Sequence, residues 1–79
     1  MDRKELERKV DEIIVDRFGV EAGVVNGTTE IEGDLGADSL DFAEVLMVLE
    51  RDFNVSITDE EAGRVVTVGD IYDLIESKA

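Results

Sequence analysis

Apolar side chains recur at helical spacing in the first eighteen residues. They fall at i, i+4, i+7, i+8 and i+12, namely Leu6, Val10, Ile13, Ile14 and Phe18. This is the stripe of an amphipathic helix with one buried face, and Gly19 then provides a stop signal. In a chain of 79 residues, other elements of the same domain must cover that face, so we expect one domain over residues 1–79.

Three further helix starts follow a long first connection. Residues 19–38 contain five glycines and no lasting alternation of apolar and polar residues, so we expect a loop there. A second helix is predicted to start near Ser39 and to end at about Asp52 or Phe53, and the segments TDEE (58–61) and TVGD (67–70) have capping-box spacing. The expected fold is all-α: a small four-helix bundle with three longer helices, a short third helix, and a long loop between helices one and two.

The second predicted helix carries apolar residues on both faces. At about 100° per residue, one side forms a core stripe of Phe42, Val45, Leu46, Leu49 and Phe53. The opposite side holds Leu40, Met47 and Val48 among Asp41, Glu44 and Arg51. Apolar residues clustered on a polar-rimmed face are typical of a surface that docks a partner protein.

Acidic residues are concentrated after the first helix. Residues 18–79 hold 15 of the 21 acidic residues and only 3 of the 8 basic ones. Such a field repels nucleic acid and anionic membranes and attracts basic partner surfaces; the alternative is that the acidity only maintains solubility. A charged N-terminus and the lack of an apolar run of about 18 residues predict no signal peptide, no membrane insertion and a cytoplasmic location.

Ser39, in the segment GADSLDF (36–42), is the strongest candidate for chemistry. A serine nucleophile needs a base, and the chain has no histidine. It also has no cysteine, and its acids fit no EF-hand spacing, so we expect neither catalytic residues nor a metal site. Either Ser39 caps the helix, or Asp38 does and leaves the Ser39 hydroxyl free at a helix start that tolerates an anionic group.

The segment DLGADSLD (34–41) resembles the attachment motif of bacterial acyl carrier proteins, and the similarity continues over residues 44–75 and covers the first helix and loop. The resemblance implies that Ser39 receives 4′-phosphopantetheine from coenzyme A through a magnesium-dependent phosphopantetheinyl transferase that recognises Asp38. It implies a monomeric, non-enzymatic carrier of acyl thioesters for fatty-acid or polyketide type enzymes with basic docking surfaces. The alternatives are a stand-alone aminoacyl, peptidyl or polyketide carrier and, further away, an unmodified helical interaction module.

The resemblance also implies roles for both faces of the second helix. Partner docking would use Asp38, Leu40, Asp41, Glu44, Met47 and Glu50, with Val48 and Arg51 on the same outward face. The acyl chain would be stored between the second and third helices, beside Val45, Leu46, Leu49, Ala62 and Val65. The alternative for these five residues is ordinary core packing.

Four residues depart from the pattern that the resemblance implies. Arg51 stands where an acid is usual on the docking face, and Phe42 replaces a smaller residue, which could narrow the acyl pocket or its mouth. Thr58 stands where many members have proline, and Gly63 loosens the third helix. Together these departures lead to the hypothesis of a specialised or secondary carrier.

Overall fold

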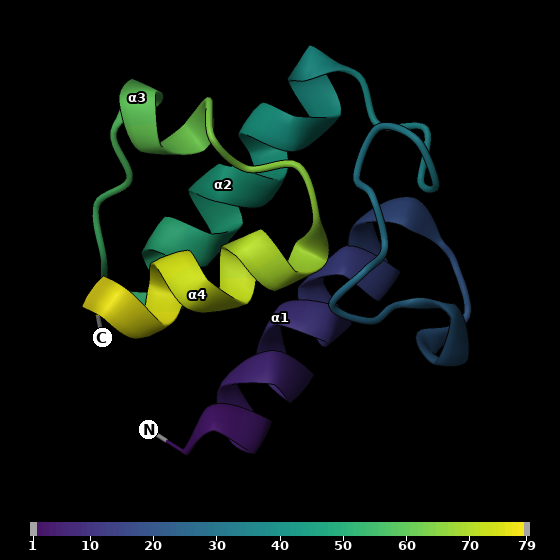
Figure 1. Ribbon diagram of the computed structural model, residues 1–79, viewed down its shortest axis with the longest axis horizontal. Helices are drawn as coiled ribbons and strands as arrows, with labels where there is room; N and C mark the ends of the chain where they lie inside the picture. Colours follow the sequence, from purple (N-terminus) through teal and green to yellow (C-terminus); the bar gives the residue numbers. More distant parts are fainter. Residues whose placement is uncertain (1, 79) are drawn as a thin grey trace.

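The protein is a bundle of helices, seen in a computed structural model that describes residues 2–78. The helices are α1 (Arg3–Phe18), α2 (Ser39–Phe53), α3 (Asp59–Ala62) and α4 (Val68–Lys78), with a 3₁₀ turn η1 (Ala22–Val24) in the first connection (Figure 1). Within the described residues there is no strand, only an isolated antiparallel bridge between Glu30 and Thr67. The predicted all-α bundle with a short third helix is therefore confirmed.

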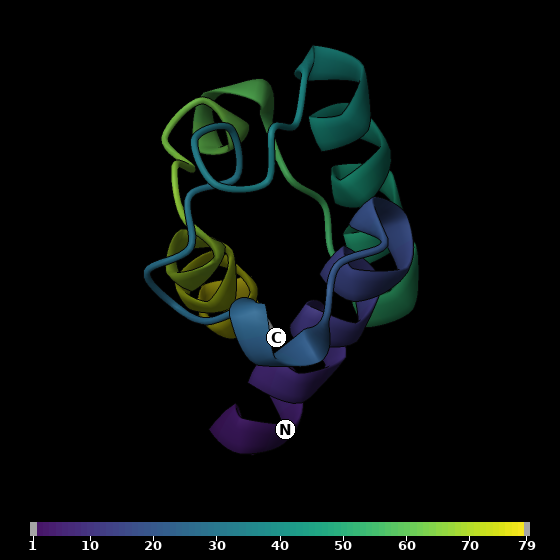
Figure 2. The ribbon, with the colours of Figure 1, turned by 90° about the vertical axis from the view of Figure 1, so that its right-hand side faces the viewer.

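The core lies between α1, α2 and α4, because α1 packs against both of the other helices. In Figure 2, α4 lies on one side of the molecule and α2 on the other. The three helices contribute Leu6, Val10, Ile14, Val45, Leu49, Val68, Ile71, Tyr72 and Ile75, all buried. The remaining members of the predicted stripes, Ile13, Phe18, Phe42, Leu46 and Phe53, are partly buried against this cluster. Helical spacing thus predicted the inward faces of α1 and α2 correctly.

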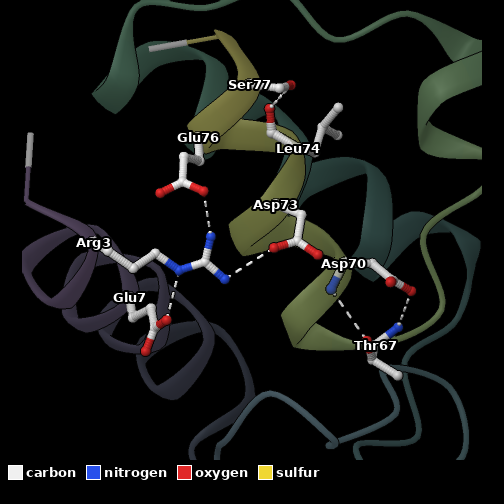
Figure 3. Close-up of polar contacts among 8 residues, drawn as sticks. All are labelled: Arg3, Glu7, Thr67, Asp70, Asp73, Leu74, Glu76 and Ser77. Atoms are coloured by element: carbon white, nitrogen blue, oxygen red, sulfur yellow. Dashed lines mark hydrogen bonds and ion pairs between the residues drawn. The ribbon is translucent and has the colours of Figure 1, made fainter.

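Local capping sets the ends of the helices. Gly19 ends α1 in the left-handed conformation, with φ of 67°, and its N–H donates to the carbonyl of Val15. Thr58 and Glu61 form a reciprocal capping box at the start of α3. At α4, the backbone N–H of Asp70 donates to the Thr67 hydroxyl at 3.1 Å, while the N–H of Thr67 donates to the Asp70 carboxylate at 3.0 Å (Figure 3).

Charged side chains tie the start of α1 to α4. The guanidinium of Arg3 pairs with Glu7 on its own helix at 2.7 Å and reaches Asp73 at 2.9 Å and Glu76 at 2.8 Å on α4 (Figure 3). All of these side chains are at least about one-third exposed, so each pair alone contributes little to stability. Their joint effect is to hold two segments from opposite ends of the chain together.

The long connection over residues 19–38 is ordered by contacts that lie far away in the sequence. Val25, Ile31 and Ala37 are buried. The N–H of Ile31 donates to the carbonyl of Val66 at 3.0 Å, and the N–H of Val68 donates to that of Thr29 at 2.9 Å. The loop therefore runs beside the α3–α4 connection, which no local sequence pattern predicted.

Glycine is required where this loop crosses the start of α4. The N–H of Gly69 donates to the carbonyl oxygen of Gly27 at 3.0 Å. A Cβ atom on Gly69 would lie 2.6 Å from that oxygen, which is too close for any side chain. The close approach holds this part of the loop against the start of α4.

Candidate functional site

Ser39 is the first residue of α2, and Asp38 caps the helix. The Asp38 carboxylate accepts the N–H of Asp41 at 2.8 Å, and the Asp41 carboxylate accepts the N–H of Asp38 at 3.3 Å. The reciprocal bonds form a capping box around the serine. Ser39 is itself exposed and is not needed for capping, so its hydroxyl is open to modification.

A tight turn delivers Ser39 to the surface. Gly36 takes the left-handed conformation with φ of 69°, which favours glycine. The next residue, Ala37, is buried, and its N–H donates to the carbonyl of Ile31 at 3.1 Å. The loop is therefore anchored two residues before the serine, and α2 begins from a fixed point.

The outward face of α2 carries two exposed apolar side chains. Leu40 and Met47 are each 66% exposed, whereas Val48 is only half-exposed. Val48 lies about 20° from Asp41 around the helix axis, and Asp41 faces α1 through an ion pair with Arg17. The apolar part of this face is thus Leu40 and Met47, with Val48 at its edge.

The side chains of the other predicted docking residues have different partners within the protein. Glu44 lies 2.8 Å from Arg17, and Arg51 lies 3.2 Å from the neighbouring Asp52. The Glu50 carboxylate accepts the N–H of Ile57 at 2.9 Å, in the connection between α2 and α3. Glu50 therefore braces that connection, in addition to any role on the outward face.

A cavity of about 330 Å³ opens directly beside the serine. Its walls come from the first loop, the start of α2, and the end of α3 with the residues after it: Glu30, Ile31, Glu32, Gly33, Asp38, Ser39, Phe42, Ala62, Gly63, Val65 and Val66. Phe42, Ala62 and Val65 thus lie where the acyl pocket was expected. Val45 and Leu49 are instead fully buried in the core, and Leu46 packs against it. The loop residues of the wall were missed, because only tertiary contacts bring them here.

The wall formed by α3 depends on a charged cap. The carboxylate of Glu61 accepts the N–H of Thr58 at 3.0 Å and lies 2.9 Å from the ammonium of Lys78. The backbone hydrogen bond first, and then Lys78, lower the pKa of Glu61 to about 2. The second capping carboxylate, Asp70, also has a lowered pKa, because the N–H groups of Thr67 and Val66 donate to it.

Residues 2–78 hold neither a cluster of metal ligands nor a membrane-spanning helix. No cluster of three or more acidic side chains there could hold a metal ion. No helix in the same range is long and apolar enough to cross a membrane.

The surroundings of Ser39 fit a phosphopantetheine group. The hydroxyl is exposed and lies at the N-terminus of a 15-residue helix, where free N–H groups and the helix dipole favour a negatively charged ester. The cavity begins at the same residue. Ser39 would carry the phosphate of the group, and the other residues that line the cavity would lie beside the attached arm.

Known proteins match this chain over almost its whole length. The family model described as a phosphopantetheine attachment site matches residues 8–75. Acyl carrier proteins from two strains of Porphyromonas gingivalis are each 47% identical over 72 residues, covering 91% of this chain and 92% of their own. A solved structure of the acyl carrier protein from Enterococcus faecalis, described for its high thermal stability, has a TM-score of 0.85 at 39% identity, with full coverage of both chains.

The fold, the free serine and these matches define a carrier domain that bears phosphopantetheine. The chain belongs to the acyl carrier protein family. Members of this family are carriers and not enzymes, so the predicted family, carrier function and cofactor are confirmed. A protein of this family works with fatty-acid synthesis enzymes and is modified by a phosphopantetheinyl transferase.

Proposed function

We propose that Ser39 is the attachment residue and that the chain acts as one monomeric carrier domain over residues 1–79. The observation that supports this most strongly is that Asp38 caps α2 while Ser39, the first residue of the helix, is exposed. The bound arm supplies a terminal thiol that holds acyl groups as thioesters, which a chain without cysteine lacks. The bacterial relatives support a cytoplasmic location.

In this proposal, residues 38–41 prepare the site for the transferase. The capping box between Asp38 and Asp41 fixes the backbone on both sides of Ser39. The carboxylate of Asp38 is exposed beside the hydroxyl, so it is also placed to be recognised by the transferase. The positive end of the α2 dipole partly offsets the negative charge that the phosphate would add between two aspartates.

Docking is proposed to use the outward face of α2. Leu40 and Met47 offer apolar contact to a partner, and Asp41 and Glu44 lie next to them. The partner is a protein with a basic, partly apolar surface, because charge complementarity steers the encounter and apolar burial holds it. Val48, Glu50 and Arg51 complete the proposed surface at its edges.

The cavity is the proposed entrance for the acyl chain. Phe42, Ala62 and Val65 line it at the level of Ser39, while Val45, Leu46 and Leu49 lie in or against the core. Cargo would first meet the Phe42 ring and would reach these three residues only if α3 moved away from α2. A bulky ring at the entrance supports a specialised carrier with restricted cargo.

Mass spectrometry tests the attachment. The protein is incubated with coenzyme A, magnesium and a promiscuous phosphopantetheinyl transferase, and its intact mass is recorded. Wild type should gain one phosphopantetheine group, and Ser39→Ala should gain none. Ser56→Ala removes another exposed serine and should behave as wild type. No gain on wild type, or a gain that survives in Ser39→Ala, rejects the assignment.

A further inference from the structure

Arg17, in the last turn of α1, bridges two acids of α2. Its Nη2 atom donates to Oδ1 of Asp41 at 2.9 Å and lies 2.8 Å from Oε2 of Glu44. The three side chains are between 32% and 45% exposed, so the bridge lies at the surface and is accessible to solvent. Arg17 of α1 is therefore already paired with Asp41 and Glu44, the two acids that lie beside Leu40 on the proposed docking surface.

The same compensation extends along α2. The helix has four acids, and within the described residues each of them has an internal partner. Asp41 and Glu44 face Arg17, Glu50 accepts the N–H of Ile57, and Asp52 pairs with Arg51. The face is consequently less available to an incoming cation than the acidic sequence indicates.

We propose that Arg17 is a specificity-determining residue: it is an internal counter-ion that a basic partner must displace from Asp41 and Glu44. This inference rests on the docking surface proposed above. Partners whose lysines or arginines approach both acids closely can displace Arg17, and partners with weaker basic surfaces cannot. Apolar contact with Leu40 and Met47 then carries a larger share of recognition than it would on an uncompensated face.

The effect should be modest and dependent on salt. An exposed ion pair is weak, so displacing it should slow association by about twofold to fivefold. Salt at about 0.3 M screens charges beyond several ångströms, and the difference should then disappear. A purely structural role would not produce this salt dependence.

Replacing Arg17 could also disturb the start of α2, because its partner Asp41 belongs to the capping box. The test must separate this structural effect from the effect of charge. The second carboxylate oxygen of Asp41 accepts the N–H of Asp38 in the capping box beside Ser39. Arg17→Lys keeps a cation near Asp41 and should restore most of the wild-type rate, so comparison of Lys with Gln isolates the charge. Urea unfolding of each variant identifies any loss of the fold.

The test measures association of the full-length apo protein with a promiscuous phosphopantetheinyl transferase, without coenzyme A, by stopped-flow fluorescence. Arg17→Gln should associate about twofold to fivefold faster than wild type at about 20 mM salt, and equally fast at about 0.3 M. Arg8→Gln is the matched control, because Arg8 lies on the same helix, pairs with Glu12 of that helix, and its replacement changes the net charge equally. It should give less than half of that increase.

Glu44→Gln and the double variant complete a cycle. Glu44→Gln should slow association, and Arg17→Gln should accelerate it less in that background because Arg17 then covers one acid fewer. If Glu44→Gln slows association but Arg17→Gln is no faster than Arg8→Gln, the inference is overturned and the docking surface stands. If Arg17→Gln is slower than wild type, Arg17 itself contacts the partner and the inference is also overturned. If Glu44→Gln changes nothing, the docking surface is misplaced.

Discussion

The two sides of this bundle are built differently. Where α1 meets α4, Leu6, Val10, Ile71 and Ile75 are buried to within 1% of complete exclusion from solvent. On the other side, α3 has only four residues and none of them is buried. Its capping box stabilises the short helix itself, and the ion pair between Glu61 and Lys78 ties it to α4. The first side is stabilised by apolar packing, and the second, which borders the cavity, by a few polar contacts.

This difference shows where the molecule can open. Local opening requires little free energy where few apolar contacts are lost. Moving α3 would break the ion pair between Glu61 and Lys78 and would expose no fully buried residue of α3, whereas separating α1 from α4 would expose the core. The cavity beside Ser39 therefore lies on the side of the bundle with fewer buried residues, where we expect local opening to require less free energy.

The largest expected effect comes from matched valine truncations on the two sides. Val10 is fully buried in the core, while Val65 is partly exposed on the cavity wall. Val10→Ala should lower the free energy of unfolding by about 2–3 kcal/mol. Val65→Ala should lower it by less than about 1 kcal/mol, because no enclosed space is created. Urea denaturation measures both, and equal losses would mean that the α3 side is packed as tightly as the core.

The next expected effect on stability concerns a polar contact between α1 and α4, on the packed side of the bundle. The hydroxyl of Tyr72 on α4 donates to the carboxylate of Asp11 on α1. Tyr72→Phe should cost about 1–2 kcal/mol, because the half-buried carboxylate loses its partner. Asp11→Asn and the double variant provide the control. If the hydrogen bond is responsible for both losses of unfolding free energy, the loss in the double variant should be smaller than the sum of the two single losses.

The pH dependence of that loss has a definite sign. Burial raises the pKa of Asp11 above its usual value of 3.8, although the hydrogen bond from Tyr72 opposes this change. A carboxyl with a raised pKa in the fold stabilises it fully only below its unfolded pKa, and that contribution is lost as pH rises through the folded value. The cost of Tyr72→Phe should thus be largest near neutral pH and smaller below about pH 4. A cost that grows on acidification would contradict this.

The stability of α3 should depend on pH in the opposite direction and to a smaller extent. The pKa of Glu61 is lowered to about 2 from 4.5, so its stabilising contribution is present above pH 4.5 and is lost as pH falls toward 2. Amide hydrogen exchange of residues 59–62 should therefore accelerate in that window relative to α1, once the intrinsic pH dependence is subtracted. Glu61→Gln has no charge to titrate and should show no such acceleration. Uniform protection of α3 and α1 down to pH 2 would remove the difference between the two sides.

The smallest effect on stability, but a direct one on function, is expected for Phe42→Thr. The ring is partly buried and lines the cavity beside Ser39. Its removal should cost about 1 kcal/mol or less, because the site is already open on one side, and should let the protein accept longer acyl chains. Loading of a series of chain lengths onto wild type and Phe42→Thr measures this. Identical acceptance by both proteins would show that the ring does not limit cargo.

Much of the fold could be predicted because the deciding contacts are local. Thr58 with Glu61, Thr67 with Asp70, and Gly19 with Val15 each act within four residues, and all three set helix ends as expected. The stripes of α1 and α2 repeat within four residues and correctly predicted the inward faces. Resemblance to known carriers then connected Ser39 with a phosphopantetheine arm.

The cavity wall and the charge pairing could not be predicted in the same way. The carbonyl of Val66 meets the N–H of Ile31, and Arg17 meets residues 24 and 27 positions away. Such contacts depend on how helices and loops pack, and spacing along one helix carries no information about them. Glu50 illustrates the limit, because its carboxylate turns to a loop N–H that only the fold places there.

The sequence by itself determined the helices and the inward faces of α1 and α2, and it left Ser39 and Asp38 as two possible caps at the start of α2. Propensity, periodicity and capping all act within one or two turns. Only the tertiary structure decided that Arg17 covers the two acids beside Leu40 and that the first loop completes the cavity at Phe42. Both arise from packing between segments distant in the chain, where the orientation of one element determines which groups of another are left for a partner.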